Sequence, residues 1–474
     1  MSYYKMTENQ IRYDVFPLIV VDGKETVIHI RPLGSKKEFE VGREYDMIIT
    51  DMEGADPKDF PSSGMYDYTK ATYTEDGFVI PYTFHGEGEH CIAFTDDKQG
   101  VAEKFVRKFI NKFFVYSVKE DLAKRYPFIG DLHVHTNLSD GTENPEIVCA
   151  NYRKYGYDFM AITDHHRYYP SLKAIEFYKN VPTDLTIVPG EEVQLPPIYG
   201  MMNEIHIINF GGEYSVNALV EYLAVNEAGK DLSVRAIREN DVPDVMTLDE
   251  FSAKMKALTD KTEVPEDVDA LPVAVCCWIF DEIKKANGLG IYAHPNWRKR
   301  LSYQIPEKFT DHLMKLRPFD AFEVLGGENY FEQNGFQTIR YYEEAAKGNR
   351  FPIVGSTDSH SSSPIFKKGH ICSTIIFSPE NERRALIDSV KDYYSVAVDT
   401  ISEEFRLVGE NRFVRYGCFL LQNYYPLHDE LCFEEGRMMK QYASGTPEEK
   451  EEALAVLSLI KGRLEKHRKK YFDF

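Results

Sequence analysis

The chain has 474 residues, of which 43% are apolar and 13% are aromatic. This is enough for a substantial hydrophobic core and, by length, for about two or three domains. The 56 basic and 76 acidic residues give a formal net charge of -20. Such acidity argues against general nucleic-acid binding, which requires a basic surface to neutralise phosphates.

Seven cysteines occur without a C-x-x-C pair, which favours a reduced protein over a disulfide scaffold. Cys276 and Cys277 lie in the apolar run LPVAVCCWIF and are expected to be buried thiols. The N-terminal residues MSYYKMTENQ lack the pattern of a signal peptide, and no apolar run approaches membrane-spanning length. We therefore expect a cytoplasmic protein without membrane association.

Residues 1–118 are predicted to form a β-sandwich-like domain. The segment PLIVVDGKETVIHI has two β-rich runs around Asp22-Gly23, which is a strong hairpin signal, and YTEDGFVIPYTF repeats it at Asp76-Gly77. Short strands between Gly, Pro and Asp turns are typical of a sandwich of immunoglobulin-like size. Its role stays open: it could cover a site, bind a partner or pair two copies into a homo-oligomer.

Residues 119–400 alternate between strand-like and helix-like segments, which predicts an α/β fold with a parallel sheet. Seven such units fit a closed, seven-stranded (β/α) barrel better than an open sheet. The interval of about 213–275 is too long for one crossover and contains a capping box at Thr247 and Glu250, so we interpret it as a helical insertion. Residues 401–474 are predicted to form a helical C-terminal tail, in which Thr446, Pro447 and Glu449 begin a helix.

Metal-binding residue types gather where the apolar runs end. In GDLHVHTNLSDG, alternate side chains of a strand share a face, so Asp131, His133 and His135 point one way and Leu132 and Val134 the other. Any one histidine could be a hydrogen-bonded core residue. Nine groups in equivalent positions are harder to obtain by packing, because burying them together without a cation would be costly. Since strand ends meet at one rim of a barrel, we predict a metal site there, formed by His133, His135, Asp140, His165, Glu192, His206, His294, Asp358 and His360.

These segments resemble the PHP family (polymerase and histidinol phosphatase domains). The motifs DLHVHTNLSDG, ITDHH, PGEEV, IHI, AHP and GSTDSH occur in family order between about Tyr126 and Thr400. The resemblance implies a distorted seven-stranded β/α barrel with a trinuclear metal centre. It is closest to the small-molecule phosphoesterase branch, which commonly has SDG at the end of the first motif and ITDH in the second.

The resemblance also implies how three metals would share the ligands. The first would be held by His133, His135, Glu192 and Asp358, the second by Glu192, His206 and His294, and the third by Asp140, His165 and His360. Some members have histidine in place of Asp140, so the third site could differ in affinity or metal. The family pattern places the ligand directly before the valine, which selects Glu192 over Glu191.

The ligand chemistry and two neighbouring carboxylates complete the predicted centre. Mixed imidazole and carboxylate ligands suit zinc, iron or manganese and disfavour magnesium or calcium. Asp131 and Asp164 adjoin ligands and have two equally supported roles: they orient imidazoles for catalysis, or they only form hydrogen bonds at the barrel mouth.

Further residues are candidates for handling substrate. His166 could protonate the leaving group, although an exposed rim histidine is the simpler interpretation. In NWRKR, Arg298 could bind a phosphate through two parallel hydrogen bonds. Weaker candidates are Lys299 and Arg300 in the same segment, and Lys367 and Lys368 after DSHSSSPIF.

The reaction predicted from these features is hydrolysis of a phosphate ester of a small molecule. A hydroxide bridging the first two metals would be the nucleophile, and the third cation would bind phosphate oxygens. The main alternative is a PHP-type 3′–5′ exonuclease or nucleotide phosphodiesterase, which uses the same chemistry. The acidity of the chain and the lack of a basic stripe argue against this alternative. A non-catalytic, metal-stabilised binding module is the third hypothesis, and an incomplete ligand set would favour it.

Overall fold

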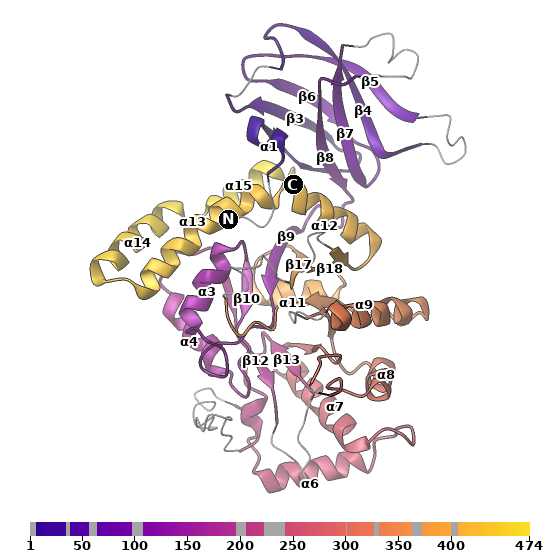
Figure 1. Cartoon of the computed structure of the whole chain (residues 1–474), viewed down its shortest axis with the longest axis vertical. Coiled ribbons are helices and arrows are strands. Elements are labelled where there is room, and N and C mark those ends of the chain that lie inside the picture. Colours follow the sequence, from indigo (N-terminus) through magenta and orange to yellow (C-terminus); the bar gives the residue numbers. More distant parts are fainter. Residues whose placement is uncertain are drawn as a thin grey trace. The chain divides into compact units, whose positions relative to one another are not determined.

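The computed structural model describes residues 6–34, 38–55, 64–96, 108–195, 205–221, 242–299, 301–326, 331–362, 372–399 and 406–474. The chain divides into two compact units (Figure 1). The first unit contains Met1–Tyr126, Asn411–Leu431 and Gly462–Phe474, and the second contains Pro127–Glu410 and Cys432–Lys461. Segments of the helical tail thus belong to both units. The predicted domain boundaries stay a prediction.

Two sheets form most of the first unit and share one hydrophobic core. A three-stranded sheet has the order β1 (Tyr13–Phe16), β3 (Glu25–Pro32), β6 (Phe78–Thr83). A five-stranded sheet has the order β2 (Ile19–Val21), β8 (Asn111–Val118), β7 (Gly88–Thr95), β4 (Glu44–Ala55), β5 (Gly64–Thr72). The rings of Phe78 and Phe94, one from each sheet, stack with centroids 4.1 Å apart in this core. A short helix, α1 (Glu8–Arg12), precedes β1.

The two Asp-Gly turns form, but the predicted hairpins are wrong. Strand β2 pairs with β8, whereas β3 pairs with β1 and β6, so the turn at Gly23 joins strands of different sheets. Likewise, the turn in which Thr74 and Gly77 exchange backbone hydrogen bonds of 3.0 and 3.1 Å connects β5 to β6 in the other sheet. A tight turn reverses the chain locally, but the partner of each strand is decided by long-range packing on the core.

Replacing Gly77 by alanine is expected to destabilise the first unit by about 1–3 kcal/mol. The φ angle of Gly77 is 97°, and a Cβ added there would overlap the carbonyl oxygen of Ile30. Gly23→Ala is a matched control, because its φ is 73° but a Cβ there has nothing within 4 Å. Urea unfolding should show the larger loss for Gly77→Ala, and equal losses would contradict the predicted clash.

The second unit has a mixed α/β fold built on two sheets. The six-stranded sheet has the order β11 (Thr186–Val188), β10 (Phe159–Ala161), β9 (Tyr126–Asp131), β17 (Cys372–Ser378), β18 (Ser395–Asp399), β19 (Arg406–Val408). The five-stranded sheet has the order β12 (Gly190–Val193), β13 (Ile207–Phe210), β14 (Leu289–Tyr292), β15 (Ala321–Leu325), β16 (Ile353–Gly355). The predicted α/β class is therefore confirmed at this level.

The predicted parallel pairing is present between β9, β10 and β11 and between β14, β15 and β16, but both sheets also contain antiparallel pairs. Strand β13 runs antiparallel to both β12 and β14, while β14, β15 and β16 are parallel to one another. Strands β17, β18 and β19 are also joined by antiparallel pairing. The reversal of β13 brings its N-terminal end to the edge where the parallel strands have their C-terminal ends. A residue that precedes β13 can therefore reach the same place as residues that follow the other strands.

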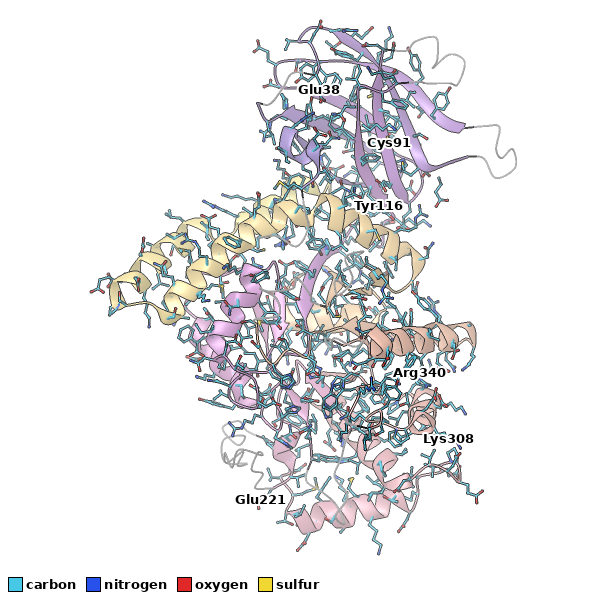
Figure 2. The ribbon with its side chains drawn as sticks, viewed as in Figure 1. Glu38, Cys91, Tyr116, Glu221, Lys308 and Arg340 are labelled. Carbon is cyan, nitrogen blue, oxygen red and sulfur yellow. The ribbon has the colours of Figure 1, made fainter. Side chains whose placement is uncertain are left out.

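Helices lie between and against these strands. Outside the insertion and the C-terminal segment they are α3 (Pro145–Lys154), α4 (Tyr169–Tyr178), α8 (Glu307–Leu316), α9 (Phe331–Ala346) and α11 (Arg383–Lys391). Helix α9 packs on β15 and is tied to α8 by Arg340, labelled in Figure 2, which pairs with Glu307 at 3.0 Å. The insertion contains a 3₁₀ turn, Asn217–Leu219, then α6 (Leu248–Thr259) and α7 (Ala270–Lys285). The capping box of Thr247 and Glu250 is present at the start of α6, as predicted.

The C-terminal segment follows the short strand β19 as helices α12 (Asn411–Asn423), α13 (Tyr425–Ser444), α14 (Pro447–Ile460) and α15 (Arg463–Tyr471). Thr446 and Glu449 form the capping box that begins α14. All seven cysteines are free thiols; Cys276 is buried and Cys277 is half-buried on α7. In the part of the chain that the structure describes, every helix is too short or too polar to cross a membrane.

Candidate metal centre

Eight of the nine predicted ligands lie on strands or near strand ends, and the ninth, Asp140, lies in the loop that follows β9. His133 and His135 directly follow β9, His165 follows β10, and Glu192 lies on β12. His294 follows β14, and Asp358 and His360 follow β16. His206 instead precedes β13, whose reversed direction brings it to the same edge. Leu132 and Val134 are buried, as are His133 and His135.

Ligand atoms converge in three overlapping groups, within each of which they lie no more than 4.8 Å apart. The groups are His133, His135 and Asp358; His133, Glu192 and His294; and His135, Asp140, His165 and His360. His206 joins through an ion pair to Glu192. The groups share members, because His133 belongs to the first two and His135 to the first and third, and the assignment of ligands to individual metals stays a prediction.

The centre of the cluster is formed by two imidazoles and two carboxylates. The Nε2 atoms of His133 and His135 lie 3.1 Å apart, and they are 3.2 and 3.0 Å from Oδ1 of Asp358. The same nitrogens lie 3.5 and 3.3 Å from Oε2 of Glu192. Each of the two imidazoles therefore lies within 3.5 Å of both carboxylates. The other oxygen of Glu192 faces His206, so this carboxylate has imidazoles on both sides.

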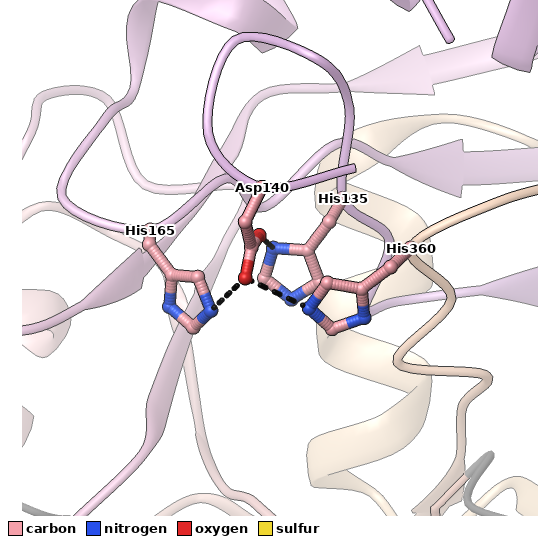
Figure 3. A group of neighbouring side chains, drawn as sticks. All are labelled: His135, Asp140, His165 and His360. Atoms are coloured by element: carbon pink, nitrogen blue, oxygen red, sulfur yellow. Dashed lines mark ion pairs between the residues drawn. The ribbon is translucent and has the colours of Figure 1, made fainter. Parts of the chain in front are cut away.

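In the third group Asp140 lies between the rings of His165 and His360 (Figure 3). Oδ2 of Asp140 is 3.5 Å from Nε2 of His165 and 3.2 Å from Nε2 of His360. The side chains of Asp140 and His360 are 49% and 39% exposed, whereas those of His133 and Glu192 are fully buried. A small molecule could therefore reach the cluster from the side of Asp140 and His360.

The buried part of the cluster fits bound cations. Both carboxylate oxygens of Glu192 and both ring nitrogens of His294 are buried without a hydrogen-bond partner, although charged groups lie near them. Burial alone raises the pKa of Glu192, but the imidazoles of His165 and His206 outweigh it and hold that pKa well below its usual range. An ionised, buried carboxylate beside imidazoles that do not satisfy its hydrogen bonds is costly unless a cation completes the site. The donor set suits divalent transition metals.

One further residue of the cluster was not predicted from the sequence. Glu323 lies on β15, is fully buried, and its Oε2 is 3.0 Å from Nδ1 of His133. A single acidic residue inside the apolar strand AFEVL was the signal that could have identified it, since an isolated buried carboxylate requires a partner. The indole ring of Trp297, also not predicted, lies 6.2 Å from the ring of His206.

Neighbouring Glu191 and Glu192 face opposite sides of β12. The Glu191 carboxylate accepts hydrogen bonds from the backbone of Val216 and from the side chains of Ser215 and Asn217, at 2.6 to 3.0 Å. It is therefore satisfied within the protein, away from the imidazoles. Only the carboxylate of Glu192 points into the cluster.

Asp131 and Asp164 hold the loops that carry ligands. Asp131 accepts hydrogen bonds from the backbone nitrogen and hydroxyl of Thr357, at 3.1 and 2.5 Å, and from the backbone nitrogen of His133. Asp164 does the same for Thr136, at 2.7 and 2.5 Å. Burial raises their pKa values to about 7 and about 6, although these hydrogen bonds lower them in part. These contacts fit the expected role of Asp131 and Asp164 as hydrogen-bond acceptors beside the ligands, and a role in catalysis stays a prediction.

The predicted substrate residues lie at the rim. Nδ1 of His166 donates to the carbonyl oxygen of Gln194 at 2.7 Å, and burial, with the charge of His165, lowers the pKa of His166 to about 4. Arg298 is 55% exposed and lies 3.7 Å from Glu332, and Lys299 is half-buried beside it. The weaker candidates lie outside the described residues: Arg300, Lys367 and Lys368.

Three of the solved structures that match this chain are the following. The first is a two-domain protein from Bacteroides vulgatus described as containing a predicted PHP-like metal-dependent phosphoesterase, with 15% identity and a TM-score of 0.36. The match covers 58% of this chain and 65% of that protein, slightly less than two thirds. A candidate metal-dependent phosphoesterase from Bifidobacterium adolescentis has 18% identity, 49% and 87% coverage and a TM-score of 0.29. An amidohydrolase from Chromobacterium violaceum, with bound sulfate and no metal, has 17% identity, the same 49% and 87% coverage, and a TM-score of 0.29.

One family model matches part of the sequence. No curated protein matches the chain. Residues 131–264, however, match the model of the PHP domain. This range begins at the end of β9 and contains six of the nine predicted ligands, from His133 to His206. This part of the chain is therefore similar to the PHP domain, and it carries most of the strand-end cluster of imidazoles and carboxylates.

Proposed function

We propose that this protein is a metal-dependent hydrolase that cleaves phosphate esters of small molecules. The observation that supports this most strongly is the convergence of the nine predicted side chains on one buried cluster with an open side. Three divalent transition metals, zinc, iron or manganese, match the three overlapping groups of ligand atoms. Bound there, such metals supply an activated water as nucleophile and offset the charge that develops on a phosphate.

Buried and exposed residues of the cluster would have different roles. The buried imidazoles and carboxylates, such as His133 and Glu192, hold fixed positions and keep bulk water from the centre. Asp140 and His360, on the open side, border the space through which a phosphate ester would enter. Arg298 is exposed at the rim and has a guanidinium that can bind two phosphate oxygens. The overall charge of -20 supports a small substrate rather than a nucleic acid.

We also propose that β9, β10, β12, β13, β14, β15 and β16 make up the distorted seven-stranded barrel expected from the sequence. Two isolated bridges support closure, because they link the two sheets of the second unit. His165 pairs with Glu192 between the ends of β10 and β12, and Val134 pairs with Ser359 between those of β9 and β16. Both bridges lie at ligand residues or directly beside them.

The test begins with metal analysis of the purified protein. Stoichiometric zinc, iron or manganese is expected, followed by hydrolysis of members of a panel of small phosphomonoesters by the metal-loaded protein. Cleavage of labelled single-stranded nucleic acid instead would favour the exonuclease or phosphodiesterase alternative. A fully loaded protein that hydrolyses neither would overturn the proposal in favour of a non-catalytic binding module.

Removing the metals is expected to destabilise the second unit. A ligand that binds only the folded state stabilises it by about 2.7 kcal/mol at 100 times its dissociation constant. Dialysis against a strong chelator should therefore lower the unfolding temperature, and re-addition of the metal should restore it. Because protonation of imidazoles competes with metal, the same loss should occur on moderate acidification. An unfolding temperature that is identical with and without chelator would contradict a metal centre.

A further inference from the structure

Glu323 contacts the cluster without belonging to any of the three ligand groups. It lies on β15 with its side chain fully buried, and its carboxylate faces the ring nitrogen of His133 that points away from the other ligands. We propose that Glu323 is a positioning residue, which fixes the tautomer and orientation of His133 for metal binding. This inference deepens the proposed function and depends only on its metal-binding part.

The hydrogen-bond chemistry determines the protonation of His133. A carboxylate only accepts, so the 3.0 Å contact places the ring proton on Nδ1 of His133. The lone pair of Nε2 is then free, and that nitrogen faces His135, Asp358 and Glu192 at 3.1 to 3.5 Å. A carboxylate behind a ligating imidazole holds the ring in place and increases its basicity toward a cation.

Helix α9 in turn holds Glu323. Nε2 of Gln337 donates to the carbonyl oxygens of Glu323 and Val324, at 3.1 and 3.3 Å. The side-chain oxygen of Asn334 accepts from the backbone nitrogen of Gly326 at 2.9 Å. All three hydrogen bonds are buried, and they bind the end of β15 to the helix. The backbone that carries the side chain of Glu323 is therefore fixed opposite His133.

The test measures metal affinity rather than activity, by competition with a chromophoric chelator on metal-free protein. Glu323→Leu is expected to weaken the tightest site roughly 10- to 100-fold. Glu323→Gln should lie between Leu and the wild type, because its amide oxygen still accepts from Nδ1 of His133 but carries no charge. Cobalt-substituted protein should show a matching change in its visible spectrum.

Glu435→Gln is the matched control. Glu435 is also a buried carboxylate of the second unit, but it pairs with Arg153 and not with an imidazole. This control should retain wild-type metal affinity whatever its unfolding temperature. Unchanged affinity in Glu323→Leu, or an equal loss in Glu435→Gln, would overturn the positioning role. If the wild type binds metal but hydrolyses no phosphate ester, the proposed function fails. The metal affinities of the Glu323 variants would still decide the role of Glu323.

Discussion

Asp358→Asn is expected to reduce hydrolysis of a phosphomonoester by more than about 100-fold, beyond the loss typical when only an outer partner of a ligand is removed. Oδ1 of Asp358 lies within 3.2 Å of Nε2 in both His133 and His135, so its charge is central to the cluster. Asparagine preserves the volume and tolerates the φ of 46° found at this position. The measurement is kcat with metal content determined on the same sample.

Asp311→Asn provides the control for this substitution. Asp311 is a half-exposed carboxylate of α8 that pairs with Arg340, away from the metal cluster. The control should keep wild-type activity and metal content. Full activity of Asp358→Asn with a complete metal complement would show that this carboxylate is dispensable.

Glu435→Ala is expected to lower the free energy of unfolding by about 3–5 kcal/mol, the cost of removing one partner of a buried ion pair. Arg153 is fully buried, and its guanidinium donates to Glu435 at 2.9 Å and to the carbonyl oxygen of Tyr157 at 2.8 Å. Without Glu435 the buried cation would keep only Asp158, at 3.3 Å, as an anionic partner. Thr183 would also lose the carboxylate to which its hydroxyl donates.

Guanidinium unfolding of the metal-free protein would measure this loss independently of the metal centre. Glu176→Ala removes an exposed partner of Lys179 in the same unit and should change stability little. Equal effects of the two substitutions would mean that burial does not make the pair of Arg153 and Glu435 important.

Most of the candidate site could be predicted because its residues can be recognised from the short sequence segments in which they lie. His133 and His135 follow an apolar strand at alternate positions, and Asp358 and His360 repeat this spacing at the end of another. Metal-binding residue types at the ends of apolar runs are a signal that requires no knowledge of which strands are neighbours. The capping boxes of α6 and α14 were predictable for the same reason, because each depends on two residues three positions apart.

Features that depend on partners distant in the sequence were not predicted. The turns at Gly23 and Gly77 formed, but the strands they connect pair in different sheets. The role of Glu323 requires β15 to place it opposite His133, 190 residues earlier in the chain. For Asp131 and Asp164 the sequence supported two roles equally, and it did not identify Thr357 and Thr136 as the residues that donate hydrogen bonds to them.

Residue types and their spacing therefore specified the α/β class, the helix starts and the metal-type side chains, since these follow from interactions over a few residues. Strand order, the antiparallel course of β13 and the partners of each buried carboxylate were decided by tertiary structure. The physical reason is that apolar strands of similar composition can pair in many ways. Only burial of the whole core, together with satisfaction of every buried charge, selects among those pairings.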